Sequence, residues 1–320
     1  MRLSLVFASF AVALLVATHA GAQSYPTKPI RLIVPFTPGG GVDFNARLVA
    51  QKLTEYLGQQ VIVESRPGAG TNIGNELVAK SPPDGYTLLI NSGAMAINMA
   101  LYRNLNYDTL RDFAFVSLFS ESPNVLVVHP SLPVKTSKQL VALAKAKPGV
   151  MNYSSSGSGT TQHLSGELFN LRTGVKIVHV PFRGTSPSLT ALLSGELELT
   201  FANIPAISGF VKAGRLRPLA TTGLKRAAQM PSVPTLKEDG IDVEVTVRYG
   251  IFAPIATPKD IVNTLAAAIA KAARAPDTRQ RLLDQGAEPV GSTPEEFTKI
   301  MKEEIVRWAE VVRVSGAKAD

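Results

Sequence analysis

The stretch RLIVPFTPGGGVDFNARLVAQKL, residues 31–53, decides how the chain is organised. An apolar run ends at a proline, three glycines follow, and an amphipathic pattern then begins. This order predicts a strand, a tight turn and a helix. The turn has two interpretations. It only changes the direction of the chain, or its bare backbone lets an anion reach the unpaired N–H groups and partial positive charge of the helix N-terminus.

The same arrangement recurs at four later places. These are VIVESRPGAGTNIG (61–74), LLINSGAMAI (88–97), MNYSSSGSGTTQH (151–163) and IVHVPFRGTSPSL (177–189). In an open parallel sheet such turns lie at the carboxyl ends of the strands, where ligands bind. Five turns rich in glycine and hydroxyl groups therefore favour an anion or carboxylate site over turns with a purely local role.

Alternating apolar runs and amphipathic stretches predict an α/β fold with mostly parallel sheets flanked by helices. Two strand-rich segments, residues 113–130 and 216–223, have the character of crossings between domains. We therefore expect two domains joined by two hinge crossings. Domain 1 is discontinuous and comprises residues 23–122 plus 224–320, and domain 2 comprises residues 123–223.

Composition excludes several classes of protein. The chain has 320 residues, of which 45 % are apolar and 18 % charged, which is typical of a globular protein with room for two domains. The absence of cysteine excludes disulfides, thiolate metal sites and a cysteine nucleophile. The net charge of +8 comes from scattered Lys and Arg without interleaved aromatic residues. This pattern favours a solvated basic surface that attracts anions over a nucleic-acid interface.

Residues 1–22, MRLSLVFASFAVALLVATHAGA, have the three-part pattern of a secretory signal. Arg2 is followed by an apolar stretch and then by small residues at Ala20 and Ala22. The apolar stretch is shorter than the ~20 residues that a membrane span needs, which argues against an anchor. We expect cleavage between Ala22 and Gln23 and export to the periplasm of a diderm bacterium.

Enzyme motifs are weak. GAGTNIG (68–74) has the spacing Gly-x-Gly-x-x-x-Gly, and no acidic residue ends a strand about 20 residues later, so it departs from the dinucleotide fingerprint. Gly-x-Ser-x-Gly is absent, and the histidines have no local metal-binding spacing. We predict no cofactor, no metal and no enzyme activity. A serine hydrolase that uses Ser158 and His163 remains as an alternative, because His163 follows the serine-rich loop.

Several motifs together carry a resemblance to a known family. They are YPTKPIRLIVPFTPGGGVDFNARLVA (25–50), VIVESRPGAGTNIG, SPPDGYTLL (81–89), NYSSSGSGTTQHLSGELF (152–169), VPFRGTSPSLTALLSGELELTF (180–201) and VKAGRLRPLATTG (211–223). In this order and spacing they resemble the Bug family, the extracytoplasmic solute receptors of tripartite tricarboxylate transporters. The resemblance runs from about Tyr25 to the C-terminus. It implies a two-domain periplasmic binding protein of type II, a Venus flytrap that closes on a small carboxylated solute.

The resemblance also implies where the solute binds. In the family, backbone amides and hydroxyls of the first turn and of the middle serine–glycine loop hold the carboxylate, with bridging waters. The corresponding first-turn residues are Phe36, Thr37, Pro38, Gly39, Gly40 and Gly41, and the loop residues are Ser155, Ser156, Gly157, Ser158 and Thr160. Further contributions are expected from Ser92, Gly93, Arg183 and Asn203.

Two positions depart from the family pattern. Arg248 precedes Tyr249 and Gly250 where the family often has tryptophan, so a charge would replace an indole if this position borders the cleft. Ala202 and Asn203 stand where a small charged residue is usual. The implied partners are a carboxylic acid or amino-acid-like solute and a tripartite tricarboxylate permease, with the receptor as a monomer. A ligand-dependent partner of a sensor is the alternative within binding proteins.

Overall fold

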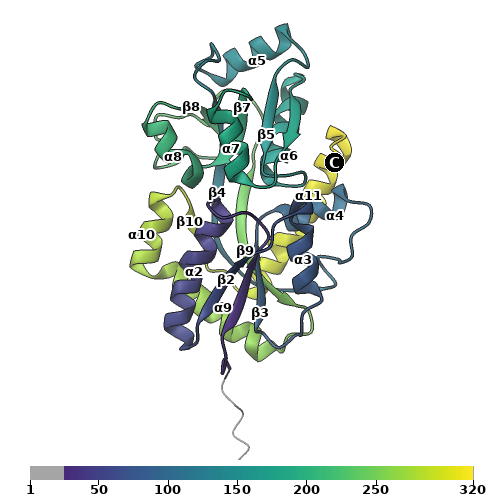
Figure 1. Ribbon diagram of the computed structural model, residues 1–320, viewed down its shortest axis with the longest axis vertical. Coiled ribbons are helices and arrows are strands. Elements are labelled where there is room, and N and C mark those ends of the chain that lie inside the picture. The colour runs from purple at the N-terminus through teal and green to yellow at the C-terminus, as the bar shows by residue number, and fades with distance from the viewer. Residues whose placement is uncertain (1–24, 320) are drawn as a thin grey trace, which may run out of the picture.

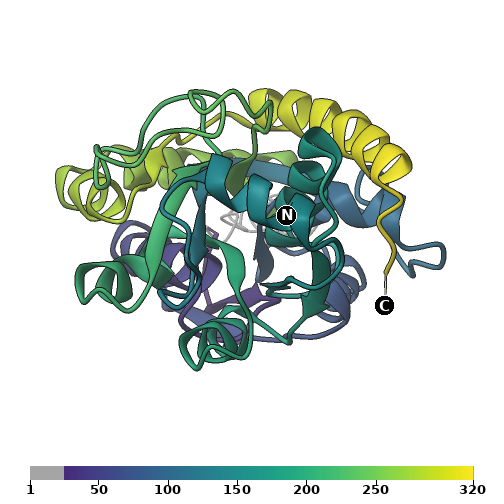
Figure 2. The same ribbon diagram turned by 90° about the horizontal axis from the view of Figure 1, so that it is seen from above.

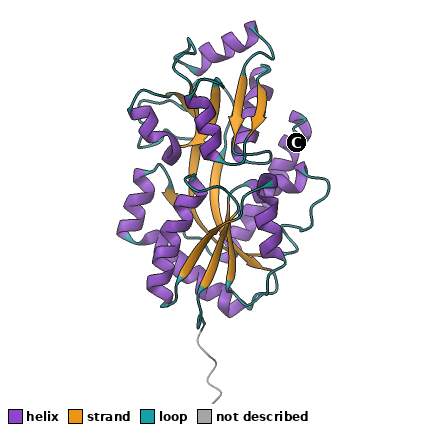
Figure 3. Cartoon of the chain, in the orientation of Figure 1, coloured by secondary structure: helices purple, strands orange, loops and turns teal. Residues whose placement is uncertain are grey.

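One path of hydrogen-bonded strands runs through the whole molecule and connects two lobes (Figures 1 and 3). The computed structural model describes residues 25–319, so the predicted signal and its cleavage site lie outside the described residues. Along the path the strands follow the order β2-β1-β3-β9-β4-β7-β5-β6, and β8 and β10 pair with β4.

The lower lobe in Figure 1 contains three parallel strands with helices on both sides. The strands are β1 (Ile30–Val34), β2 (Val61–Ser65) and β3 (Thr87–Asn91). The helices are α2 (Gly41–Leu57), α3 (Asn72–Ala79), α4 (Ala94–Leu101), α9 (Lys259–Arg274), α10 (Pro276–Asp284) and α11 (Pro294–Ser315), and a short 3-10 turn, η1 (Ala69–Thr71), precedes α3. Helices are needed on both faces because strands such as IRLIV are almost entirely apolar and buried.

The upper lobe repeats this plan with a smaller sheet. Its strands are β5 (Asn152–Ser155), β6 (Val178–Pro181), β7 (Leu199–Asn203) and β8 (Arg217–Thr221). Its helices are α5 (Ser137–Ala146), α6 (Thr161–Thr173), α7 (Thr185–Leu193) and α8 (Ile204–Lys212). Seen from above, α5 lies over this lobe and α11 runs along one side of the molecule (Figure 2).

Two long strands link the lobes. β4 (Phe113–Val128) pairs with strands of both, and β9 (Thr246–Pro254) pairs with it from Phe113↔Pro254 to Pro123↔Thr246. β10 (Glu288–Pro289) also pairs with β4. All these pairs are antiparallel, so the sheet is mixed, with the predicted parallel strands at its two ends.

The segment that we expect to be the second crossing, residues 216–223, contains a strand in the structure. That segment forms β8, which pairs with the upper half of β4, and β9 makes the return. Ala227, Met230 and Val233 pack with Val125 and Ile204 of the upper lobe. Residues 224–245 have no obvious strand or helix pattern in the sequence. The surface against which their apolar side chains pack exists only in the folded molecule, so the sequence does not indicate their lobe. The division into domains stays a prediction.

Both lobes pack around apolar clusters. One cluster lies between α2, α9 and one face of the lower sheet, and another continues from the opposite face into the upper lobe and includes the fully buried Trp308. Within residues 25–319, no helix combines the length and apolar character that crossing a bilayer requires.

Candidate functional site

Several helices begin at a pocket between the lobes, which we call the main pocket. Its cavity volume is about 20 Å³. Its lining residues are Phe36, Gly40, Gly41, Val42, Ser92, Ser156, Thr160, Thr161, Gln162, Thr185, Asn203, Val247 and Tyr249. The first residues of α2, α6 and α7 are among them, as is Asn203, the residue that precedes α8. Three of the four residues that cap these helices, Gly40, Gly184 and Asn203, make no side-chain capping bond, which leaves N–H groups for a ligand.

A second pocket, the side pocket, lies beyond Phe36 and Ser156, which line both. Its cavity volume is about 60 Å³, and its other lining residues are Pro35, residues 67–71, Gly157, Phe182, Arg183 and Gly184. In its 67–71 loop Ala69 and Thr71 have φ values of 46° and 85°, in the left-handed region that disfavours side chains. Strain of this kind is often found beside functional sites.

The glycines of the first turn are required by close approach between the lobes. Gly40 has a φ of −92°, which any residue adopts, but an added β-carbon would lie 3.0 Å from Thr185 Oγ1. A β-carbon at Gly41 would overlap the hydroxyl of Tyr249. Ser186 Oγ donates to the carbonyl of Pro38 across the same boundary, over 3.1 Å. The turn is therefore fixed by the space that the upper lobe and Tyr249 of β9 leave.

The serine–glycine loop, residues 155–160, is held by several polar groups of its own lobe and, at the Ser158 carbonyl, by the Tyr102 hydroxyl of the lower lobe. Gln162 Oε1 accepts a hydrogen bond from the Ser156 N–H over 2.8 Å. Thr160 Oγ1 donates to the Gly157 carbonyl over 2.8 Å, and Gly159 N–H donates to His163 Nδ1 over 3.2 Å. These bonds fix the backbone of the loop where it borders both pockets.

The predicted site residues fall into three groups: those that line the main pocket, those that line the side pocket and those that line neither. Phe36, Gly40, Gly41, Ser92, Ser156, Thr160 and Asn203 line the main pocket, and Gly157 and Arg183 line the side pocket. The others line neither pocket: Thr37 lies against Gly184, Pro38 and Gly39 against Ser186, Gly93 against Thr161, Ser155 faces His179, and Ser158 lies against Gly70. A role for any of them in binding remains a prediction.

Sequence reasoning missed several lining residues. In the main pocket they are Val42, Thr161, Gln162, Thr185, Val247 and Tyr249, and in the side pocket Pro35, residues 67–71, Phe182 and Gly184. Gln162 could have been found from its place in the first turn of a helix. Val247 and Tyr249 alternate along one face of β9, but the sequence does not say which face meets the pocket. Burial raises the pKa of Tyr249 to about 12, so its hydroxyl stays protonated.

The same alternation turns Arg248 away from the pocket. Its Nη1 lies 2.9 Å from Glu304 Oε1, and its Nε lies 3.5 Å from Glu121 Oε2. Trp308 Nε1 donates to the other Glu304 oxygen over 2.8 Å. Arg248 does not line the main pocket, so the condition for a new charge in the cleft is not met: the guanidinium contacts Glu304 and Glu121 instead.

Two lobes with a pocket between them, entered by helix N-termini, define a solute-binding receptor with the fold of periplasmic binding proteins. The family model described as "Tripartite tricarboxylate transporter family receptor" matches residues 45–316. The chain belongs to this family.

Individual relatives agree. BugT of Bordetella pertussis is 37 % identical over 320 residues, which cover 99 % of this chain and 98 % of BugT. A protein of R. palustris solved with adipate is 38 % identical, with a TM-score of 0.89 over 92 % of this chain and 100 % of that structure. MatC from Rhodopseudomonas palustris with bound malate is 31 % identical, with a TM-score of 0.86 over 90 % of this chain and 100 % of that structure.

Proposed function

We propose that this protein binds a small carboxylated solute in the main pocket and delivers it to a tripartite tricarboxylate permease. One observation carries the proposal: the starts of α2, α6 and α7 converge on a pocket whose lining contains no Lys or Arg. Helix N-termini and hydroxyls can hold a carboxylate without a full counter-charge. Buried without such partners, the carboxylate would be very costly.

Two further observations support this function. The basic net charge of +8 favours the approach of anions. The relatives solved with adipate and malate are similar along almost the whole chain. The proposal includes export to the periplasm, a monomeric receptor, and no covalent chemistry on the solute.

Solute capture in this proposal uses hinge closure of two domains about the linking strands. Hinge closure is a general mode of periplasmic binding proteins. The contact of Ser186 with Pro38 and the close approach of Gly40 to Thr185 join the two lobes directly over the main pocket. A bound solute that touches both lobes stabilises this closed arrangement and is shielded from water by it.

The hydrolase alternative has little geometric support. His163 Nδ1 accepts the Gly159 N–H, and the ring lies against His179 rather than in the main pocket. Within residues 25–319, no group of three His, Asp or Glu residues is placed to hold a metal ion.

A thermal-shift screen tests the proposal. The mature protein is titrated with adipate, malate and related acids, and in parallel with their diamides. A ligand that binds only the native state stabilises it by mass action, so an acid at about 100 times its Kd adds about 2.7 kcal/mol to the free energy of unfolding. We expect the diamides to add far less. Equal shifts for acid and amide would refute the carboxylate site, and cleavage of esters or amides by the wild type would refute a pure receptor.

A further inference from the structure

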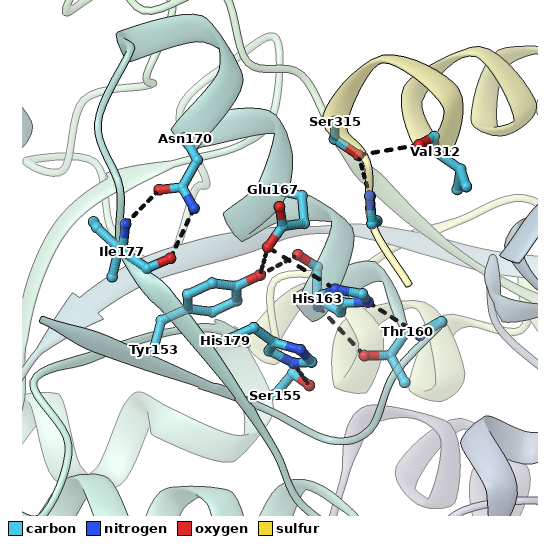
Figure 4. A network of polar contacts seen from close by, with 12 residues as sticks. Tyr153, Ser155, Thr160, His163, Glu167, Asn170, Ile177, His179, Val312 and Ser315 are labelled. Carbon is cyan, nitrogen blue, oxygen red and sulfur yellow. Dashed lines mark hydrogen bonds and ion pairs between the residues drawn. The ribbon is translucent and has the colours of Figure 1, made fainter. Parts of the chain in front are cut away.

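A buried imidazole ring, that of His163, and a half-buried one, that of His179, lie stacked behind the serine–glycine loop (Figure 4). The ring centroids of His163 and His179 are 3.9 Å apart, and the planes differ by 13°. His163 comes from α6 and His179 from β6. Nothing in the proposed function uses either ring, yet each contacts a different end of the loop.

His163 holds the far end of the loop as a hydrogen-bond acceptor. Its Nδ1 accepts from the Gly159 N–H over 3.2 Å, so in the neutral ring the proton lies on Nε2. Nε2 faces Glu167 Oε1 at 4.0 Å. If the ring were protonated, Nδ1 would also carry a proton, and two donors would then face each other.

His179 holds the near end through Ser155. Its Nε2 lies 2.7 Å from Ser155 Oγ, and that hydroxyl also contacts Gly157 N and Gly157 O, each at 3.1 Å. One assignment satisfies all three contacts. Ser155 Oγ accepts from Gly157 N–H and from His179 Nε2–H, and donates its own proton to the Gly157 carbonyl.

We propose that His163 and His179 are positioning residues that hold the two ends of the serine–glycine loop in the solute-binding geometry, and that His163 does so only while its ring is neutral. The loop borders both pockets, so its displacement weakens solute binding. The part of the proposal that concerns affinity rests on the proposed function, whereas the part that concerns the loop does not.

The surroundings of the rings favour the neutral state. Glu167 on α6 and Tyr153 on β5 face the pair, and the Tyr153 hydroxyl donates to Glu167 Oε1 over 2.6 Å. Tyr102, which follows α4, donates to the Ser158 carbonyl, and α11 places Val312 and Ser315 on this side (Figure 4). Burial lowers the pKa of His179 to about 4 and raises the pKa of the Glu167 carboxyl, a rise that the Tyr153 hydrogen bond opposes. Charge on the His179 ring is therefore disfavoured.

The decisive variants separate hydrogen bonding from packing. His163→Gln and His179→Gln keep an amide that can accept or donate but remove the ring, whereas His163→Phe and His179→Phe keep a ring without nitrogens. His129→Phe is the matched control, because His129 contacts Ser131 at 2.7 Å outside this cluster. If the rings act as positioning residues, the Phe variants should bind adipate about tenfold or more weakly than the wild type, and the Gln variants should bind it with nearly wild-type affinity. A packing role predicts the reverse order, which would overturn the proposal.

Amide hydrogen exchange without any solute provides an independent measurement. We expect the protection of Gly157 and Gly159 to fall about tenfold in the corresponding Phe variants and to survive in the Gln variants. On acidification from pH 7.5 to 4, the wild-type protection of Gly159 should fall when His163 takes up a proton on Nδ1, and that of the double Gln variant should stay level. Unchanged protection in the Phe variants, or tighter adipate binding by the wild type than by the double Gln variant at pH 4, would refute the proposal. If no acid binds the wild type, the proposed function fails while the exchange experiment still tests the positioning role.

Discussion

The first turn, residues 36–41, and the serine–glycine loop, residues 155–160, present helix N-termini to the same pocket but are stabilised differently. The first turn uses bare backbone whose position is set by neighbouring groups of the upper lobe and β9, with Asp43 accepting from the Gly39 N–H as its local support. The loop is fixed mainly by side chains of its own lobe, among them Gln162 and His163. One half of the site therefore depends on free space and the other on hydrogen bonds, and substitutions should affect the two halves by different mechanisms.

Filling the space at the first turn should have the largest effect. Gly41→Val places a branched side chain where Tyr249 Oη and Asn203 Oδ1 lie, so binding of adipate should fall by about 100-fold or more, or about 2.7 kcal/mol. The fold should survive with a loss of about 1–3 kcal/mol in the free energy of unfolding. Calorimetry and circular dichroism measure both. Gly209→Val is the control, since an added β-carbon there meets nothing within 4 Å. Wild-type affinity in folded Gly41→Val protein would remove the first turn from the site.

Removing one hydrogen bond from the loop should have an intermediate effect. Gln162→Leu keeps the size of the side chain but leaves the buried Ser156 N–H without its acceptor, which costs about 1–3 kcal/mol. We expect adipate affinity to fall roughly tenfold by isothermal titration. Gln139→Leu is a matched control, because Gln139 accepts from the Lys135 N–H in the same way on an exposed surface. A similar loss in both variants would mean that the effect does not come from the loop.

Removing the charge at the side pocket should have the smallest effect. Arg183 is exposed, so Arg183→Gln should weaken adipate binding only by about two- to fivefold, or about 0.5–1 kcal/mol. Salt should reduce the difference because exposed charges are screened. Butyrate, which lacks a second carboxylate, should be unaffected. Arg103→Gln removes the same charge from another exposed position, and an equal effect there would point to the overall field instead of the side pocket.

The features that could be predicted from the sequence were local ones, such as the ends of helices. Gly58 and Gly174 end α2 and α6 in the left-handed conformation, where glycine has no steric penalty, and both ends were visible as patterns. β4 was harder to delimit because Pro123 lies within it, and proline normally interrupts a strand. In the structure Pro123 pairs with Thr246 at the crossing between the lobes, a position that depends on the tertiary fold.

The candidate site shows the same limit. The glycine turns were recognisable from their spacing, and the family resemblance connected them. Gln162, Tyr249 and the 67–71 loop join the site only because distant segments meet between the lobes. The direction of Arg248 depends on which face of β9 is turned to the pocket, and a single sequence does not fix that face.

The pairing of β4 with β9 has a consequence for transport. Because the two linking strands are hydrogen-bonded to each other up to Pro123 and Thr246, they form one ribbon instead of two independent tethers. Such a ribbon can bend and twist, but stretching or sliding would break its backbone bonds. The two lobes can then move relative to each other mainly by changing the angle between them. In the proposed function, a permease that contacts both lobes would respond to that angle without touching the solute, so closure to the same geometry would be enough for recognition whatever solute is bound.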